Sequence, residues 1–459
     1  MSEEKRLIDK NDLTEGDIVR KLIVFFLPVA AGTIFQQLYN AVDGIVVSKF
    51  VGTEALAAVG GSAANIINVL VGFFVALTSG AAIIIAQLYG AKDAEGLSRA
   101  SNASLALCGA ISIFLTIVGL IGSPTFLVWL KTPADTMEGA ITYLRIYFCG
   151  VFFSLLFNMG SGILRAVGDS KRPFYYLLIC AGLNMVLDLV FVIVFRMGVA
   201  GVAWATVISQ VLSAVLVVIS LRKPGTAYRI DLKKIRFDKF CISKMLHVGI
   251  PAGLQNSMYS VSNMIIQVGV NTLGTATVAG WSLSGKLEGF YWSAISAAGT
   301  AVMSFVGQNY GAGRYDRIRQ CVKKGLIIFC AMTVCFSVAI LAVGKSAFAL
   351  FTDDIEVREF AYWVCSFFVP CYILWSVNEV MSGVLRGAGD AIVPTIICGA
   401  GIAGFRVIWI IFIFPLFGNL LGLSLCYPIS WVITMVGLVL RYKSGKWLKD
   451  QQHIRPEAE

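Results

Sequence analysis

Residues 161–173 read SGILRAVGDSKRP, and residues 382–394, which begin 221 positions later, read SGVLRGAGDAIVP. The shorter segments 87-QLYGA-91 and 308-QNYGA-312 are separated by the same 221 positions. Two pairs of motifs in one register indicate an internal repeat, in which each half of the chain forms a unit of the same topology. The repeated unit is therefore the first feature from which a fold can be predicted.

The segments between the repeated motifs are long and apolar. Of the 459 residues 57% are hydrophobic and 14% are charged, and the mean hydropathy is +0.79. Soluble domains are about 45–50% apolar and about 25% charged, because most of their surface must be polar. Uninterrupted runs such as 405-FRVIWIIFIFPLF-417 favour helices over barrel strands, which would alternate. The composition predicts an all-α polytopic membrane protein.

Twelve segments are long enough to cross a hydrocarbon layer of about 30 Å, which requires about 20 apolar residues. They are 21–46, 56–84, 100–123, 138–160, 173–195, 199–221, 245–270, 276–306, 323–344, 359–383, 393–415 and 420–440. The repeat divides these spans into two homologous six-helix bundles, related by an axis along the membrane normal because each has an even number of spans. The predicted units are an N-terminal segment 1–20, lobes 21–221 and 245–441, a basic linker 222–244 and a tail 442–459.

The distribution of Lys and Arg sets the orientation. With the N-terminus inside, 29 of the 37 basic residues lie in inner segments and five lie in outer loops. This is the positive-inside pattern, so both termini are expected in the cytoplasm, with the chain in the plasma membrane, most simply that of a prokaryote. The net charge of +10 then needs no nucleic-acid partner.

Several kinds of chemistry have no support in the sequence. Only two histidines are present, and the eleven cysteines contain no CxxC pair, which indicates small buried hydrophobic residues rather than disulfides or a zinc site. No P-loop, GxSxG or HExxH motif occurs, and no soluble domain is long enough for ATP hydrolysis. We expect no enzymatic activity, no cofactor and no use of ATP, so an ion gradient must supply the energy.

The twelve spans, the QxYGA-type segments after the second and eighth, and LRxxGD after the fourth and tenth resemble the multidrug and toxic compound extrusion (MATE) family. The similarity runs from about residue 16 to 445. It implies a V-shaped pair of lobes that exports amphipathic, often cationic compounds in exchange for Na⁺ or H⁺. We expect such a carrier to act as a monomer.

Ionisable side chains deep in a bilayer cost several kcal/mol and mark functional sites. The acids well inside the predicted spans are Asp43, Asp188, Glu288 and Glu379. Asn184 lies four residues before Asp188, so both share a helix face. A rise of about 1.5 Å per residue places Asp188 and Thr206 at similar depth in the outer half of the membrane. These oxygen donors suit a hard cation, and two close carboxyls equally suit a shared proton.

The resemblance supports this group as the coupling site. In one branch of MATE transporters the matching positions bind the coupling ion, and here they are Asp43, Asn184, Asp188 and Thr206; Pro28 matches the bend in that branch's first helix. The alternative is that Asp43 pairs with Lys49 or Arg196 and that Asp188 is a structural acid. The choice between H⁺ and Na⁺ remains open.

The second lobe departs from the first. At the repeat offset, Phe405, Trp409 and Tyr427 replace Asn184, Asp188 and Thr206, so the cluster occurs once. Another MATE branch carries acids in its seventh and tenth helices, where this chain has Tyr259 and Trp375. That branch's ion site is therefore not expected.

A substrate cavity can be assigned to polar and aromatic residues of several spans. The candidates are Gln36, Tyr39, Asn40, Tyr259, Lys286, Glu288, Trp292, Trp375 and Glu379. Aromatic faces attract lipophilic cations, although aromatic residues in membrane helices also serve as packing and interfacial anchors. The alternative for Glu379 is a salt bridge with Arg406 or Lys286.

Two other functions remain as alternatives to a drug antiporter. A flippase for a lipid-linked oligosaccharide has a related architecture, but more basic residues would be expected in its cavity. A channel or receptor is the alternative from another class, although duplication within one chain favours a carrier.

Overall fold

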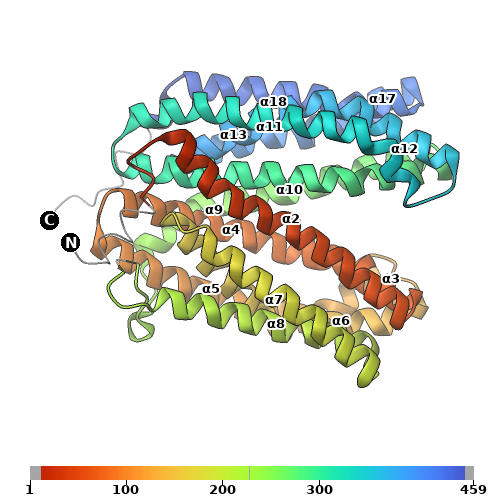
Figure 1. The fold of residues 1–459 in the computed structure, drawn as a ribbon, viewed down its shortest axis with the longest axis horizontal. Helices are drawn as coiled ribbons and strands as arrows, with labels where there is room; N and C mark the ends of the chain where they lie inside the picture. The colour runs from red at the N-terminus through yellow and green to blue at the C-terminus, as the bar shows by residue number, and fades with distance from the viewer. Residues whose placement is uncertain (1–11, 227, 450–459) are drawn as a thin grey trace.

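The computed structural model describes residues 12–226 and 228–449, and within these ranges the chain is helical without strands. The first six spans are α2 (Ile18–Phe50), α3 (Thr53–Ala58) with η1 (Val59–Ala63) and α4 (Ala64–Gly90), α5 (Ala94–Trp129), α6 (Ala134–Ala166), α7 (Lys171–Leu189) with η2 (Val190–Val194), and α8 (Gly198–Leu221). They form one lobe, which lies beside the second lobe near the chain ends and diverges from it toward the opposite end (Figure 1).

The second lobe contains the remaining six spans. They are α9 (Lys239–Asn271), α10 (Thr275–Gly311), α11 (Tyr315–Ala349), α12 (Ile355–Phe368) with η4 (Val369–Cys371) and α13 (Tyr372–Gly387), α14 (Ile392–Cys398) with η5 (Gly399–Gly404), α15 (Phe405–Ile408), η6 (Trp409–Ile413) and α16 (Phe414–Phe417), and α17 (Leu420–Ser424) with α18 (Cys426–Lys443). Short helices η3 (Leu232–Lys234) and α19 (Lys446–Lys449) lie outside the spans. The predicted all-α architecture of two six-helix bundles is confirmed.

Helices α9 and α10 are more polar than the other spans. In the described part of the chain ten helical segments are long and apolar enough to cross a membrane by length and composition, and α9 and α10 are not among them. Their polar residues include Asn256, Asn263 and Glu288, which face internal cavities rather than lipid. A span that lines a cavity can carry polar side chains at no cost to its lipid-facing surface.

Helix boundaries differ from the predicted spans where capping and glycine determine them. Asp17 caps α2, which therefore begins at Ile18, and Asp238 caps α9, which begins inside the predicted linker. The predicted span 56–84 is interrupted by η1, where Gly61 has non-helical dihedral angles (φ −90°, ψ −117°). Glycine pairs such as the one here are a common cause of kinks in long helices. Apolar length alone does not report these features.

The first helix of each lobe packs into the core of the other lobe at its inner end. Leu22 and Phe26 of α2 belong to the hydrophobic core of the second lobe, where the rings of Phe26 and Phe329 lie 5.2 Å apart, edge to face. Cys241 and Met245 of α9 belong to the core of the first lobe. This exchange joins the lobes at the end where the described chain begins and ends (Figure 1).

The repeated motifs form a close contact between the lobes. Gln87 Nε2 donates to the carbonyl of Gly387 (3.0 Å), and Gln308 Nε2 donates to the carbonyl of Ala166 (2.7 Å), so each QxYGA segment bonds to the LRxxGD segment of the opposite lobe. A Cβ on Gly90 would lie 1.9 Å from the Gln308 carbonyl oxygen. A Cβ on Gly311 would lie 1.8 Å from that of Gln87. The inner ends of the lobes are therefore closed against each other.

Candidate functional site

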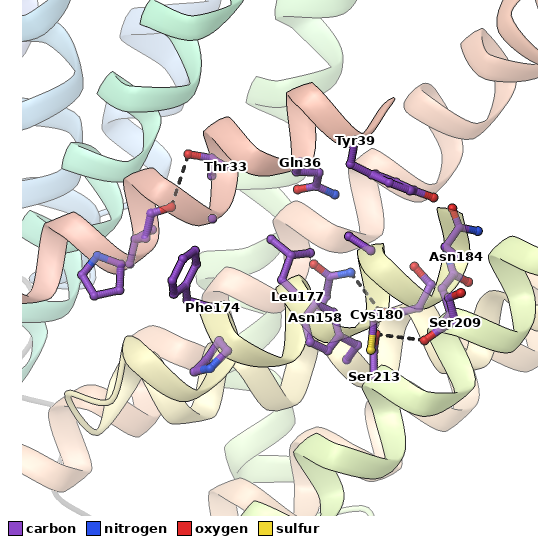
Figure 2. Close-up of a pocket in the computed structure, with 18 of the residues that line it drawn as sticks. Thr33, Gln36, Tyr39, Asn158, Phe174, Leu177, Cys180, Asn184, Ser209 and Ser213 are labelled. Atoms are coloured by element: carbon purple, nitrogen blue, oxygen red, sulfur yellow. Dashed lines mark hydrogen bonds between the residues drawn. The ribbon is translucent and has the colours of Figure 1, made fainter. Parts of the chain in front are cut away.

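A cavity of about 210 Å³ lies inside the first lobe, between α2, α6, α7 and α8 (Figure 2). Five residues singled out from the sequence line it, namely Pro28, Gln36, Tyr39, Asn184 and Thr206. Figure 2 shows Tyr39 and Asn184 pointing toward each other at one end of the cavity, with Phe174 toward the other end. Pro28 lies inside α2, where its missing N–H removes one helical hydrogen bond.

Two carboxyl groups lie together at the Tyr39 end of this cavity. Asp188 is 1% exposed near the end of α7, and Asp43 is partly buried in α2. Their side chains interact with each other, and the hydroxyl groups of Tyr39 and Tyr143 lie close to both. The structure thus brings together two acids that are 145 positions apart in the sequence.

The acid pair has no basic partner. Among residues 12–226 and 228–449, neither Asp43 nor Asp188 forms a salt bridge, and the Oδ1 atom of each is buried without a hydrogen-bond partner. The alternative pairing of Asp43 with Lys49 or Arg196 is therefore not present. Both amide atoms of Asn184 are likewise buried and unpaired in this part of the chain. Buried polar groups normally have partners, so this cluster has unused capacity to hold a ligand.

Neutral hydroxyl groups complete the cluster. Thr206 Oγ1 donates to the carbonyl of Val202 (3.1 Å), and the same hydroxyl interacts with those of Tyr39 and Tyr143. Tyr143 was not selected from the sequence; the available signal was a tyrosine pair, Tyr143 and Tyr147, on one face of a span. Those two rings stack with centroids 6.4 Å apart.

The donor set limits which ion can be held. Two carboxylates with hydroxyl and amide oxygens suit one small hard cation, or a proton shared by the carboxyls. Within the described residues no group of three or more His, Cys, Asp or Glu side chains could hold a metal ion. A π-helical turn, η2, begins two residues after Asp188, and such turns occur often at functional sites.

The second lobe contains an aromatic cavity at the corresponding place. It has a volume of about 420 Å³ and is lined by the rings of Tyr259, Trp281, Trp292, Phe368, Trp375, Tyr427 and Trp431. Trp409, which replaces Asp188 in the repeat, is buried and donates its indole N–H to the carbonyl of Gly422 (2.9 Å). Glu288 also lines this cavity.

Glu379 faces a second cavity of about 420 Å³, which lies between the lobes and includes Ser79 from α4. Its carboxylate lies 3.7 Å from the guanidinium of Arg386. The alternative of a salt bridge is therefore correct in kind and wrong in partner, since neither Arg406 nor Lys286 makes it, and Glu379 also lines a cavity as predicted. The reason is helical: residues seven positions apart lie on the same face of α13.

Two of the predicted cavity residues lie elsewhere. Lys286 is exposed, with its ammonium group 5.3 Å from the centre of the Phe351 ring, and Asn40 is exposed on α2. Neither is among the described residues that line the three cavities above. Tyr259, Trp292 and Trp375 line both 420 Å³ cavities, so the aromatic residues connect the second lobe to the centre of the molecule.

Comparison with known proteins gives consistent matches over the whole chain. The MatE family model matches residues 28–190 and 251–414, one segment in each lobe. The chain is 30% identical to "Probable multidrug resistance protein YpnP" of Bacillus subtilis (strain 168), over 95% of this chain and 97% of that protein. It is 23% identical to "Multidrug export protein MepA" of Staphylococcus aureus, over 88% of this chain and 89% of that protein.

The fold is also that of a solved transporter. A structure described as an outward-facing conformation of a multidrug resistance MATE family transporter superposes with a TM-score of 0.87 at 24% identity, covering 96% of this chain and 98% of that one. The family match and the similarity to YpnP both extend over most of the chain. This chain therefore belongs to the MATE family of multidrug efflux transporters, which are multi-pass membrane carriers of small molecules and not enzymes.

Proposed function

We propose that this transporter exports amphipathic, mainly cationic compounds in exchange for H⁺ or Na⁺, and that Asp43, Asn184, Asp188 and Thr206 hold the coupling ion. The observation that supports this proposal is the interacting pair of buried carboxyls without a salt bridge in the described part of the chain. Two adjacent negative charges in a low-dielectric site repel each other. A bound cation or proton relieves that repulsion.

The coupling step follows from this electrostatic argument. A ligand shifts a two-state protein only by binding one state more tightly than the other. In our proposal the acid pair holds its ion in one arrangement of α2, α7 and α8, and the lobes open to the other side when the ion leaves. Lobes 21–221 and 245–441 then move as units about the linker 222–244, in a monomer with both termini in the cytoplasm and with no cofactor.

The test is efflux from proteoliposomes in which the proton and sodium gradients are set independently. Ethidium serves as the organic cation, and Asp188→Asn is expected to lower gradient-driven efflux at least tenfold while the melting temperature stays near that of the wild type. Glu379→Gln is expected to cost less, because its charge is already paired with Arg386. Glu359→Gln, which removes an exposed charge, is the matched control.

The two gradients identify the coupling ion, since efflux follows only the gradient of the ion that is exchanged. Full gradient-driven efflux by Asp188→Asn would contradict the proposal. A greater loss in Glu379→Gln than in Asp188→Asn would move the coupling site to the second lobe.

A further inference from the structure

The aromatic cavity of the second lobe contains two opposite charges. Among its described lining residues Glu288, from α10, and Arg406, from α15, are the two that carry a charge. They form no salt bridge with each other or with any described residue. In the adjoining cavity Glu379 and Arg386 do form a pair. In the same lobe, Glu379 and Arg386 form a salt bridge, whereas Glu288 and Arg406 do not.

Arg406 is fixed in place by neutral groups. Arg406 is only 4% exposed. Its guanidinium lies 4.0 Å from the centre of the Tyr427 ring, and its Nη1 donates a hydrogen bond to Asn263 Oδ1 (3.1 Å). Its Nε donates to Ser430 Oγ (3.4 Å). Arginine remains charged at any ordinary pH and has five N–H donors in a planar fork. A full positive charge therefore faces the cavity with neutral neighbours.

Glu288 of α10 also has neutral neighbours. Tyr372, Ser284 and Trp292 lie near its carboxyl, and its Oε1 atom is buried without a hydrogen-bond partner among the described residues. A buried charge that lacks an opposite charge is costly. Each of the two charged groups can therefore gain from a ligand group of opposite sign.

We infer that this cavity binds an aromatic zwitterion, with its ammonium group at Glu288, its carboxylate at Arg406 and its ring among the tryptophans. A purely cationic ligand would leave the Arg406 charge without a counter-ion, and a purely anionic ligand would leave the Glu288 charge without one. A carboxylate can accept two parallel hydrogen bonds from a guanidinium. This inference rests on the proposed function and adds to it a substrate class.

The binding test compares three probes that share one aromatic ring and differ in charge. They are 4-(aminomethyl)benzoate, its methyl ester, which is a cation, and its N-acetyl derivative, which is an anion; the biphenyl homologues with a longer separation of charges form a second series. Quenching of tryptophan fluorescence in detergent-purified protein reports occupancy, because Trp281, Trp292, Trp375 and Trp431 line the cavity. At one or both lengths the zwitterion is expected to bind at least tenfold more tightly than either singly charged relative.

Substitutions that remove one of the two charges are expected to change which probe binds most tightly. Glu288→Gln is expected to make the N-acetyl anion the preferred ligand of the series, and Arg406→Met the methyl-ester cation. A reversal of preference cannot arise from misfolding, and Arg406→Lys, which keeps the charge, retains the preference for the zwitterion. Glu359→Gln and Lys345→Gln remove exposed charges of the same lobe and leave the order unchanged.

Two results would overturn the inference. One is that the ester or the N-acetyl compound binds the wild type as tightly as the zwitterion, or more tightly, at both lengths. The other is that neither zwitterion quenches the fluorescence. Binding is measured without any gradient, so it does not depend on ion coupling. A coupling failure appears instead in the efflux assay of Asp188→Asn, and the two proposals can fail separately.

Discussion

Asp43 and Asp188 sit within a ring of hydroxyl and amide groups that carry no formal charge. In such surroundings the net charge of the acid pair depends on whether a proton or cation is bound, because neither carboxyl forms a salt bridge with a described Lys or Arg. An acid that already has a salt-bridge partner, such as Glu379, gains less from binding an ion. This contrast is why we propose the first-lobe acids, and not Glu379, as the coupling residues.

The Tyr143 hydroxyl is expected to tune the acid pair. Tyr143→Phe removes a hydroxyl that interacts with Thr206 and lies close to Asp43 and Asp188, and one hydrogen bond contributes about 0.5–1.5 kcal/mol. We therefore expect ion-driven efflux to fall about two- to tenfold, with a displaced dependence of rate on ion concentration. Tyr147→Phe is the control, since the Tyr147 hydroxyl interacts with Ser154 and Gln210 instead. Equal effects of both substitutions in the efflux assay would contradict this role.

Asp238 provides a pH-dependent contribution to stability outside the membrane. The backbone N–H of Cys241 and the guanidinium of Arg99 donate to it and hold the pKa of its carboxyl below the usual range. The carboxylate thus stabilises the fold fully above the unfolded pKa of about 3.9, and the contribution is lost as the pH falls through the lowered folded value.

Asp238→Ala is accordingly expected to destabilise the protein by about 1 kcal/mol at pH 7, because it removes the helix cap of α9 and an ion pair that is half exposed on the arginine side. Thermal unfolding in detergent measures this difference, which should be the same at pH 7 and pH 5 and should shrink near pH 3. Asp238→Asn retains the cap and loses less. A difference that grows on acidification would contradict the assignment.

At the scale of elements, α4 and α10 approach each other more closely than their side chains would allow. The distances from Gly90 and Gly311 to the opposite backbone leave no room for a methyl group, and the obstacle is backbone rather than a flexible side chain. Glycine is required here for close approach rather than for an unusual dihedral angle. The repeated QxYGA motif therefore makes a contact between the lobes, and its glycine allows the two backbones to approach.

Gly90→Ala and Gly311→Ala are expected to open the inner ends of the lobes. Spin labels at Glu95 and Arg319, exposed near the inner ends of α5 and α11, should report a shift toward longer distances, and efflux should fall because the closed state is lost. Gly109→Ala is the matched control, since a Cβ there meets nothing within 4 Å, and glycine in a helix is less stable than alanine by about 0.5–1 kcal/mol. Unchanged distances in Gly90→Ala would show that the contact does not hold the lobes together.

At the scale of the whole molecule, helix α2 connects the proposed coupling site to the interface between the lobes. The inner part of α2 lies in the core of the second lobe, while Tyr39 and Asp43, further along the same helix, belong to the first-lobe cluster. A change in ion occupancy at Asp43 therefore acts on a helix that contacts both lobes. This continuity is a physical route by which ion binding can alter the relative position of the lobes.

Labels at Ser48 and Thr272, at the outer ends of α2 and α9, should detect that movement. Protonation or sodium loading is expected to shift the distribution of distances between them, and Asp43→Asn combined with Asp188→Asn should abolish the response. A disulfide between cysteines at the two positions should stop efflux, and reduction should restore it. A distribution that ignores pH, sodium and substrate in transport-competent protein would rule out this coupling route.

Periodicity and repetition within the chain were sufficient to predict the architecture and the shared helix face of Asn184 and Asp188. Apolar length specifies spans, the 221-residue offset specifies two equivalent lobes, and the spacing of Asn184 and Asp188 places both on one face of α7. These features are local or simply repeated, and helix geometry translates them directly into position. The exclusion of an equivalent cluster from the second lobe followed from the same offset, through Phe405, Trp409 and Tyr427.

What only the tertiary structure decided is how faces from distant helices meet. Three features depend on how the helices are rotated and how deep they lie. They are the position of Tyr143 in the acid cluster, the pairing of Glu379 with Arg386, and the separation of Glu288 from Arg406. The bonds of Gln87 and Gln308 across the lobes depend on rotation and depth as well. Rotation and depth are set by the packing of side chains from many parts of the chain, so a periodic pattern shows which face is polar but not which residue that face will meet.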